Sequence, residues 1–220
     1  MRARWRATVE EFREHLPYTL MAAATALGLL GVLTFLARLM DRQSVLPSAA
    51  QNLFHTTHFF HLFLSAIATT AMFWRYDRRR AKAILIGIVG TALPCGASDA
   101  IFPLLGGWFM GAPMQAHICF LEHPLLVWPF VLAGVFVGFL LPPVRTSTHL
   151  AHGGHVLLSS AASGLYLVSF GMTEWFRFAP FVFLLLVAAV LIPCCTSDIV
   201  FPLMLTRRDE AELHAIHRAV

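Results

Sequence analysis

The sequence predicts an all-α integral membrane protein with six transmembrane helices, arranged as two inverted three-helix repeats. The first observation is composition: 58% of the 220 residues are hydrophobic and 13% are charged, whereas soluble domains carry about a quarter charged residues. The second is a series of six apolar segments, each long enough to cross ~30 Å of hydrocarbon as a helix. The third is a pair of polar motifs that occurs once in each half of the chain.

The six apolar segments divide the chain into two repeats of three helices each. The first repeat covers residues 1–110, with helices predicted at about 17–39, 49–74 and 82–105. The second repeat covers residues 111–220, with helices predicted at about 124–142, 148–172 and 178–205. Because three is an odd number, the second repeat must enter the membrane from the opposite side. Inverted repeats of this kind are common in secondary transporters.

Basic residues predict the orientation of these helices. They gather in segments that six spans place on one side of the membrane: 1–6, 75–82, Arg145 and 207–208. The loop 106–122 on the other side has no Lys or Arg. The positive-inside rule therefore puts both termini in the cytoplasm of a multi-pass cell-membrane protein, here a bacterial inner membrane. The basic charge is expected to meet lipid headgroups and not nucleic acid, and the first apolar run is expected to remain as a helix because no convincing cleavage site follows it.

Each repeat carries three histidines with the spacing H-x-x-H-x-x-H inside an apolar segment. The first triplet is His55, His58 and His61, and the second is His149, His152 and His155. Steps of three residues turn a helix by about 300°, so each triplet covers a stripe of about 120°. One helix face can therefore offer two or three imidazoles to a single centre. Ionisable side chains at membrane depth are costly and usually functional.

A second motif follows each triplet, LPCGASDAIFPLL at 93–105 and IPCCTSDIVFPLM at 192–204. Cys95 and Asp99 are four residues apart and share a helix face, as do Cys194 and Asp198. A proline follows each aspartate by four residues, and it has no N–H to bond the aspartate carbonyl. We therefore expect the third helix of each repeat to be kinked or unwound around its cysteine and aspartate, facing protein or a wet cavity.

A shorter Glu-His element precedes each repeat's apolar segments, with Glu14 and His15 in the first copy and Glu122 and His123 in the second. The alternation of the spans predicts one polar cluster per leaflet, with each repeat lending its Glu-His pair to the other's cluster. The outer cluster is expected to contain His55, His58, His61, Cys95, Asp99, Glu122 and His123. The inner cluster is expected to contain His149, His152, His155, Cys194, Asp198, Glu14 and His15.

This combination of side chains predicts a metal site. Imidazole, thiolate and carboxylate together favour Zn²⁺, Fe²⁺, Co²⁺ or Ni²⁺ over Mg²⁺ or Ca²⁺, with Zn or Fe the expected ion. The leading hypothesis is a transporter or permease for a divalent transition metal, with one site per leaflet. The chain has no nucleotide-binding or Ser/His/Asp signature, so any transport is not powered by ATP through this chain. A transporter is favoured over an enzyme. The expected partners are the metal ion and the bilayer, and a homo-oligomer is left open.

Two other functions fit the same residues. Histidine clusters at two depths would also suit two haems b that pass electrons across the membrane, or paired metal centres. Proline-flanked cysteines in inverted three-helix halves resemble the transmembrane thiol–disulfide transporters, which implies an electron carrier using Cys95 and Cys194. Here the cysteine lies in the third helix of each half, and that family has no need of six histidines. His117, in the outer loop, is either an entry ligand or without a role.

Overall fold

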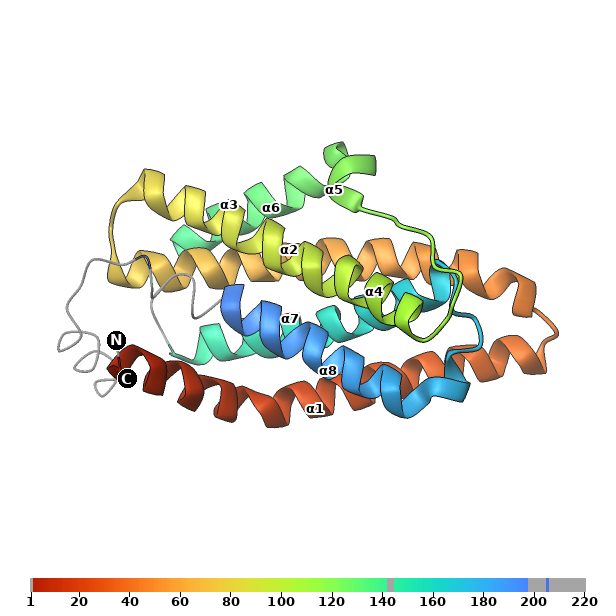
Figure 1. The fold of residues 1–220 in the computed structure, drawn as a ribbon. Helices are drawn as coiled ribbons and strands as arrows, with labels where there is room; N and C mark the ends of the chain where they lie inside the picture. Colours follow the sequence, from red (N-terminus) through yellow and green to blue (C-terminus); the bar gives the residue numbers. More distant parts are fainter. Residues whose placement is uncertain (1, 142–144, 198–204, 206–220) are drawn as a thin grey trace.

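The computed structural model describes the backbone of residues 2–141, 145–197 and 205, and the side chains of 13, 15–75, 77–141, 153–194, 196–197 and 205. These residues form an all-helical structure without strands (Figure 1). The long helices are α1 (Arg2–Leu39), α2 (Leu46–Tyr76), α3 (Arg80–Gly96), α6 (Pro124–Leu140), α7 (Arg145–Ser169) and α8 (Ala179–Cys195). The short elements are η1 (Gln43–Val45), η2 (Ala97–Ile101), α4 (Phe102–Phe109), α5 (Cys119–Glu122) and η3 (Trp175–Phe178).

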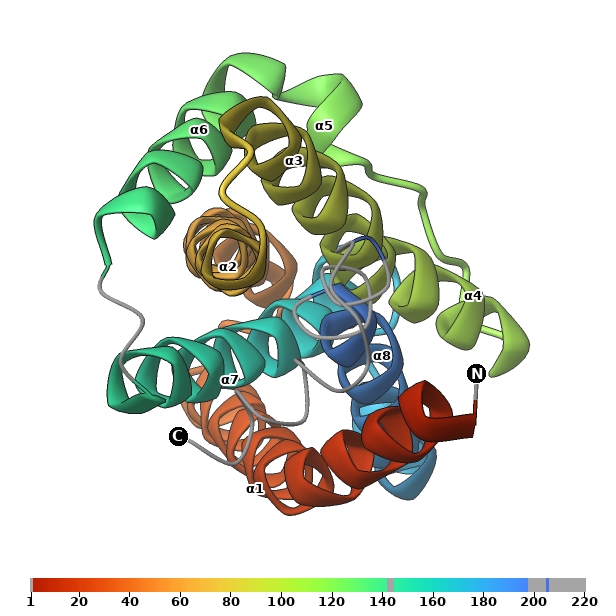
Figure 2. The same ribbon diagram turned by 90° about the vertical axis from the view of Figure 1, so that its left-hand side faces the viewer.

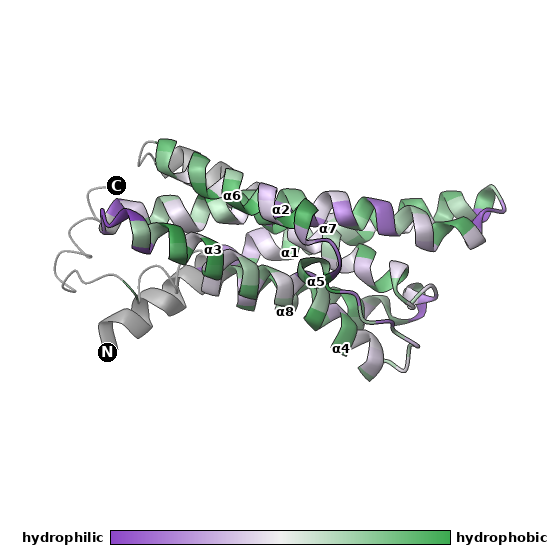
Figure 3. Cartoon of the chain, turned by 90° about the horizontal axis from the view of Figure 1, so that it is seen from above, coloured by the Kyte–Doolittle hydropathy of each residue, from purple (hydrophilic) through white to green (hydrophobic). Residues whose placement is uncertain are grey.

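Three of the described helical segments are long and apolar enough to cross a membrane: His15–Leu39, Arg80–Phe109 and Trp175–Cys194. A fourth apolar helix, Pro124–Leu140, is shorter. Large apolar side chains are exposed along these segments, as at Phe35 and Phe136. Figure 3 shows the hydrophobic colouring along α3, α6 and α8, whereas hydrophilic residues gather in the connection between α2 and α3. This distribution suits a protein whose outer surface faces lipid.

α2 and α7 lie inside the bundle. Figure 2 shows α2 enclosed by α3, α6 and α7, and α2 packs more extensively against α7 than any other two elements pack together. The first helix of each predicted repeat packs on helices of the other repeat. α1 packs on α7 and α8, and α6 packs on α2 and α3. Successive long helices run in opposite directions, so their connections alternate between the two ends of the bundle (Figure 1).

The position of α2 and α7 explains why they are less apolar than the segments around them. Each presents a polar stripe at a spacing of four residues, which brings side chains onto one helix face. The stripe members are fully buried: His61, Ser65 and Thr69 on α2, and His155, Ser159 and Ser163 on α7. Polar groups taken out of water need hydrogen-bond partners. Side chains of α3, η2 and the end of α8 supply them, as Cys95 does for Ser65 and Ser98 for Ser159.

Glycines let α6 approach the backbone of α2. A Cβ on Gly138 would lie 2.9 Å from the carbonyl oxygen of Ile67, and a Cβ on Gly134 would overlap the carbonyl of Phe63. Two small residues four apart are a common way for membrane helices to pack closely. α6 is thereby held tightly against the helix that carries the first histidine triplet.

The rod from α3 to α4 departs from α geometry at Asp99. The sequence predicted a kink or unwinding there, and the structure has a π-helical turn, Ala97–Ile101, inside a helix that continues on both sides. Pro103 cannot donate to the carbonyl of Asp99, and the N–H of Phe102 bonds to the carbonyl of Ala97. Residues 196–197 at the end of α8 are also π-helical. Turns of this kind are frequent at functional sites.

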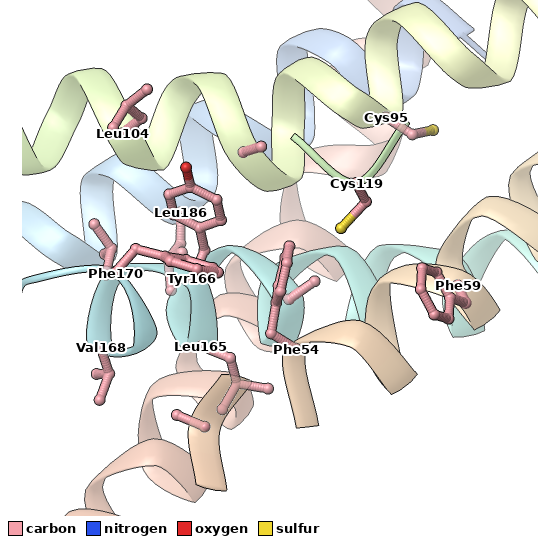
Figure 4. Close-up of a cluster of buried hydrophobic side chains, with 14 of the residues drawn as sticks. Phe54, Phe59, Cys95, Leu104, Cys119, Leu165, Tyr166, Val168, Phe170 and Leu186 are labelled. Atoms are coloured by element: carbon pink, nitrogen blue, oxygen red, sulfur yellow. The ribbon is translucent and has the colours of Figure 1, made fainter. Parts of the chain in front are cut away.

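An aromatic layer packs beneath the loop that connects α4 to α5. Phe54 on α2 makes edge-on contacts with Tyr166 on α7 and with Phe170, the residue after α7, at ring-centroid distances of 5.4 and 5.7 Å. Figure 4 shows these three side chains within the buried cluster. The loop is tied to them by its backbone, because the N–H of Gln115 donates to the carbonyl of Phe170 at 2.7 Å. The layer gives the loop a rigid base at the end of the bundle where the first histidine cluster lies.

Candidate metal centre

Three clusters of side chains that could hold a metal ion lie along α2 in the described bundle, and two of them share a residue. In each cluster the ligand atoms lie within 4.8 Å of one another. The clusters are His55, His117 and His123; His58, His61 and Asp99; and His61, His155 and Cys194. His61 belongs to two of them, so the second and third clusters are contiguous.

The first cluster lies at the loop end of the bundle. The Nε2 atoms of His55 and His117 are 3.0 Å apart, and the ring of His123 is 5.1 Å from that of His55. His55 and His123 are partly exposed, whereas His117 is buried. The sequence had left the role of His117 open, because it lies outside both repeated motifs. Its two neighbours in this cluster were predicted to lie together.

His117 is held in place by contacts to its backbone N–H and to its ring. The N–H of His117 donates to the hydroxyl oxygen of Tyr166 at 3.0 Å. The ring Nδ1 lies 2.8 Å from a carboxylate oxygen of Glu122, whose other oxygen accepts the N–H of Ile118 at 3.0 Å. The structure thus brings Glu122 to the cluster as a partner of a histidine, with its own two oxygens already occupied.

Burial and these contacts set the pKa values around the loop. Burial lowers the pKa of His117, against the opposing charge of Glu122. Burial opposes ionisation of Glu122, but hydrogen bonds from Ile118 and His117 outweigh it, and the pKa is lowered. Burial raises the pKa of Cys119 to about 12. At neutral pH the loop therefore presents a neutral imidazole, an ionised carboxylate and a protonated thiol.

The second cluster is centred on the fully buried carboxylate of Asp99. One oxygen, Oδ2, lies 2.8 Å from the Nδ1 of His58 and 2.6 Å from the Nδ1 of His61. The other, Oδ1, accepts hydrogen bonds from Ser98 at 2.6 Å and from Ser159 at 2.9 Å. α2 supplies both histidines, η2 supplies Ser98 and Asp99, and α7 supplies Ser159. The cluster therefore joins elements from both predicted repeats.

The third cluster lies where α2, α7 and α8 meet. The Nε2 of His61 is 3.8 Å from the Sγ of Cys194, and the rings of His61 and His155 are 5.0 Å apart at 81°. All three side chains are fully buried. An imidazole pair and a thiol in one dry position form a ligand set typical of zinc and related ions.

Cys95 adjoins the third cluster without belonging to it. Its thiol donates to Ser65 at 3.1 Å and interacts with the thiol of Cys194. Matching residues of the two repeats make matching contacts. Cys194 donates to Ser159 at 3.6 Å, just as Cys95 donates to Ser65. Equivalent contacts also join Ser98 to Ser159, at 3.1 Å, and Ser197 to Ser65, at 3.4 Å.

The structure differs in one respect from the predicted arrangement of one polar cluster per leaflet. The sequence assigned His61 to the outer cluster and His155 and Cys194 to the inner one, and the structure places all three together. The reason is that α2 and α7 pack against each other, so the last histidines of the two triplets meet. Glu14, His149, His152 and Asp198 lie outside the described side chains. His15 is half-buried on α1 and belongs to none of the three described clusters.

The sequence carries a signal for the serines around these clusters. Ser98 and Ser197 occupy matching positions in the Pro-Cys motifs, and Ser65 and Ser159 each follow the last histidine of a triplet by four residues. Registered small polar residues of this kind are candidates for hydrogen bonding to site residues. His117 gave no comparable signal, because a folded loop brings it to the site.

The chain matches no protein-family model, and no curated protein or solved structure is similar enough to be matched to it, so its function has to be argued from its own residues.

Proposed function

We propose that this protein is a membrane permease for a divalent transition metal ion such as Zn²⁺ or Fe²⁺. The observation that carries the proposal is the row of ligand-forming side chains along α2. The row begins at the partly exposed His55 and ends at the fully buried pair His61 and His155. It offers an ion successive ligands from the loop end of the bundle to its centre.

The composition of the row favours movement of the ion over permanent binding. Each of the three clusters in the described part of the chain has three ligand-type side chains, and in the second of them Asp99 already accepts four hydrogen bonds. Structural zinc sites, in contrast, use four protein ligands and are closed. An incomplete set leaves a coordination position through which an ion can be exchanged. Conduction also requires several sites that bind strongly enough to admit an ion and weakly enough to release it. Adjacent clusters that share His61 support this proposal because they place two candidate sites next to each other.

We further propose that the bundle spans the membrane six times as two inverted repeats, with both termini in the cytoplasm. The three long apolar segments and the shorter α6 support four of the spans. α2 and α7 supply the other two, since their polar faces are turned toward each other and away from lipid. Packing of α1 on α7 and α8, and of α6 on α2 and α3, is the exchange expected of two equivalent halves.

In this proposal the second half of the route continues beyond the third cluster toward the cytoplasm. Its ligands are the members of the second repeat that lie outside the described side chains: Glu14, His149, His152 and Asp198. The two repeats would then meet at the centre of one route, at the place where His61 and His155 are in contact.

A second candidate function is a thiol–disulfide carrier, favoured by the contact between the thiols of Cys95 and Cys194. In this reaction the two thiols would lose two electrons and two protons to an acceptor disulfide and form one disulfide bond. The histidines give less support to haem binding, because the rings of His61 and His155 touch edge to face at 5.0 Å and leave no room for a haem plane between them.

Metal uptake into liposomes tests the proposed function. The purified protein is reconstituted into vesicles that contain a metal-sensitive dye, and empty vesicles serve as the control. We expect saturable influx of Zn²⁺, Fe²⁺ or Co²⁺ and no influx of Mg²⁺ or Ca²⁺, which prefer oxygen ligands. Absence of influx for every transition metal would contradict the proposal. Reduction of an enclosed disulfide by external thiol, in place of metal influx, would establish the second candidate.

A further inference from the structure

We infer that the buried ion site consists of the Nε2 of His61, a ring nitrogen of His155 and the Sγ of Cys194, and that Asp99 positions the histidines without binding the ion. This inference deepens the proposed function and rests on it only for the movement of the ion. It changes the role that the sequence suggested for Asp99, which was that of a direct ligand.

Asp99 has no acceptor position left for a metal ion. An ionised carboxylate offers about four lone-pair positions. His58 and His61 occupy Oδ2 at 2.8 and 2.6 Å, and Ser98 and Ser159 occupy Oδ1 at 2.6 and 2.9 Å. The distances from Oδ2 to the two histidine nitrogens are also shorter than the spacing between two ligands of one metal ion. That spacing is about 3.3 Å for metal–ligand bonds of about 2.0 Å in tetrahedral geometry. The carboxylate is therefore saturated by the protein.

The bond to Asp99 determines which nitrogen of His61 is available. An ionised carboxylate can only accept, so the Nδ1 of His61 carries the hydrogen. In the neutral imidazole, which is the form that binds a metal ion, the Nε2 then has the lone pair. Metal-binding histidines commonly give their other N–H to a carboxylate in this way. His117 has the same arrangement, with its Nδ1 on Glu122 and its Nε2 toward His55. The pattern thus occurs at both ends of the row.

The free Nε2 of His61 faces the other two ligands. It lies 3.8 Å from the Sγ of Cys194, and tetrahedral coordination with bonds of about 2.0 Å to nitrogen and 2.3 Å to sulfur requires a separation of about 3.5 Å. His155 has ligand atoms within 4.8 Å of both. The three ligands come from α2, α7 and α8, so small shifts of packed helices are sufficient to close the site around an ion.

The ligand set determines the class of ion. One thiolate and two imidazoles favour Zn²⁺, Co²⁺ and similar ions, and they exclude Mg²⁺ and Ca²⁺. Cys95 offers a matched control, because it is equivalent to Cys194 in the repeat and its thiol already donates to Ser65 at 3.1 Å. It lies outside the group of ligand atoms that includes Cys194.

Titration of the purified protein with Co²⁺ under reducing conditions tests the site directly. The wild type is expected to show thiolate-to-cobalt charge-transfer absorption in the near ultraviolet. Cys194→Ser is expected to lose this absorption and Cys95→Ser to keep it. Asp99→Asn is expected to keep it with about 10–100-fold weaker Co²⁺ binding, the usual result of removing a residue that orients a ligand. X-ray absorption of the cobalt-loaded wild type, which needs no variant, should show one sulfur and two nitrogen ligands.

Several results would overturn the inference: no charge-transfer band in the wild type, loss of the band in Cys95→Ser, or its survival in Cys194→Ser. Complete loss of Co²⁺ binding in a folded Asp99→Asn protein would show that Asp99 is a ligand. The outcome is separable from the proposed function. A normal band without metal influx into liposomes contradicts the permease alone, whereas influx without the band contradicts this site alone.

Discussion

His61 and Cys194 lie 3.8 Å apart, Nε2 to Sγ, although 133 residues separate them in the chain. The contact joins a helix of the first predicted repeat to a helix of the second. It turns two local motifs into one buried ligand set, which neither repeat could form alone. The interface between the halves is where transporters of inverted-repeat architecture place their substrate sites.

Loss of His61 should impair metal uptake more than loss of any other single histidine. His61→Ala removes a side chain shared by two clusters, at the buried end of the row. We expect uptake into cells to fall by more than the roughly 10–100-fold typical of losing a residue that only orients a ligand. His214→Ala, in the polar C-terminal segment, is the control and should transport normally. Equal uptake by His61→Ala and wild type at matched membrane expression would show that the row is not the route.

Equivalent substitutions in the two repeats should have equivalent effects. His58→Ala and Asp99→Ala alter the second cluster, and His152→Ala and Asp198→Ala alter the matching positions of the second repeat. If the ion passes through both halves, each change should abolish or strongly reduce uptake while the protein still inserts. Normal transport by the second pair would mean that the second repeat has the same structure as the first but does not bind the ion during transport.

His117 should determine how readily an ion enters. It belongs to the cluster nearest the loop, so His117→Ala weakens capture of the ion while the buried clusters remain intact. We expect the metal concentration for half-maximal uptake to rise several-fold and the maximal rate to change little. Glu122→Gln, which keeps the shape of the partner of His117, should have a smaller effect in the same direction. A lower maximal rate with an unchanged half-maximal concentration would argue against a role in entry.

Close packing of α6 on α2 should depend on Gly134. An added methyl group there would overlap the carbonyl of Phe63 and lie 2.7 Å from the Cβ of Ala66. Overpacking of this kind costs about 1–3 kcal/mol, so Gly134→Ala should lower the melting temperature of the detergent-solubilised protein. Gly28→Ala is the matched control, since its added methyl would meet nothing within 4 Å. Equal melting temperatures for the two variants would show that α6 does not need this close approach.

The repeated motifs contain most of the residues that form the three clusters, but the hydrogen-bond partners of these residues could not be predicted in the same way. Spacing places His58 and His61 on one helix face because the helix has a fixed period. Spacing does not determine that one oxygen of Asp99 lies within hydrogen-bond distance of both histidine rings, because that depends on how η2 packs against α2. The apolar pattern likewise predicted helices where they occur, but the pairing of α2 with α7 is a property of packing.

The difference at the third cluster has the same origin. Counting spans separated His61 from His155 by assigning each triplet to one leaflet. A triplet covers about two turns of helix, or roughly 10 Å, so the last histidine of each reaches toward the middle of a membrane about 30 Å thick. Two helices that pack in opposite directions then bring those two ends together, with ring centroids 5.0 Å apart.

The most direct test of a buried metal site is elemental analysis and an absorption spectrum of the purified wild-type protein, with a His61→Ala, His155→Ala, Cys194→Ala triple variant alongside. The site predicts that the wild type binds Zn²⁺ or Fe²⁺ at equilibrium with the free ion in the dialysis buffer, that the triple variant does not, and that neither shows a Soret band. A Soret band lost in the triple variant would assign the histidines to haem. Equal metal content in the two proteins would contradict a metal site at His61, His155 and Cys194.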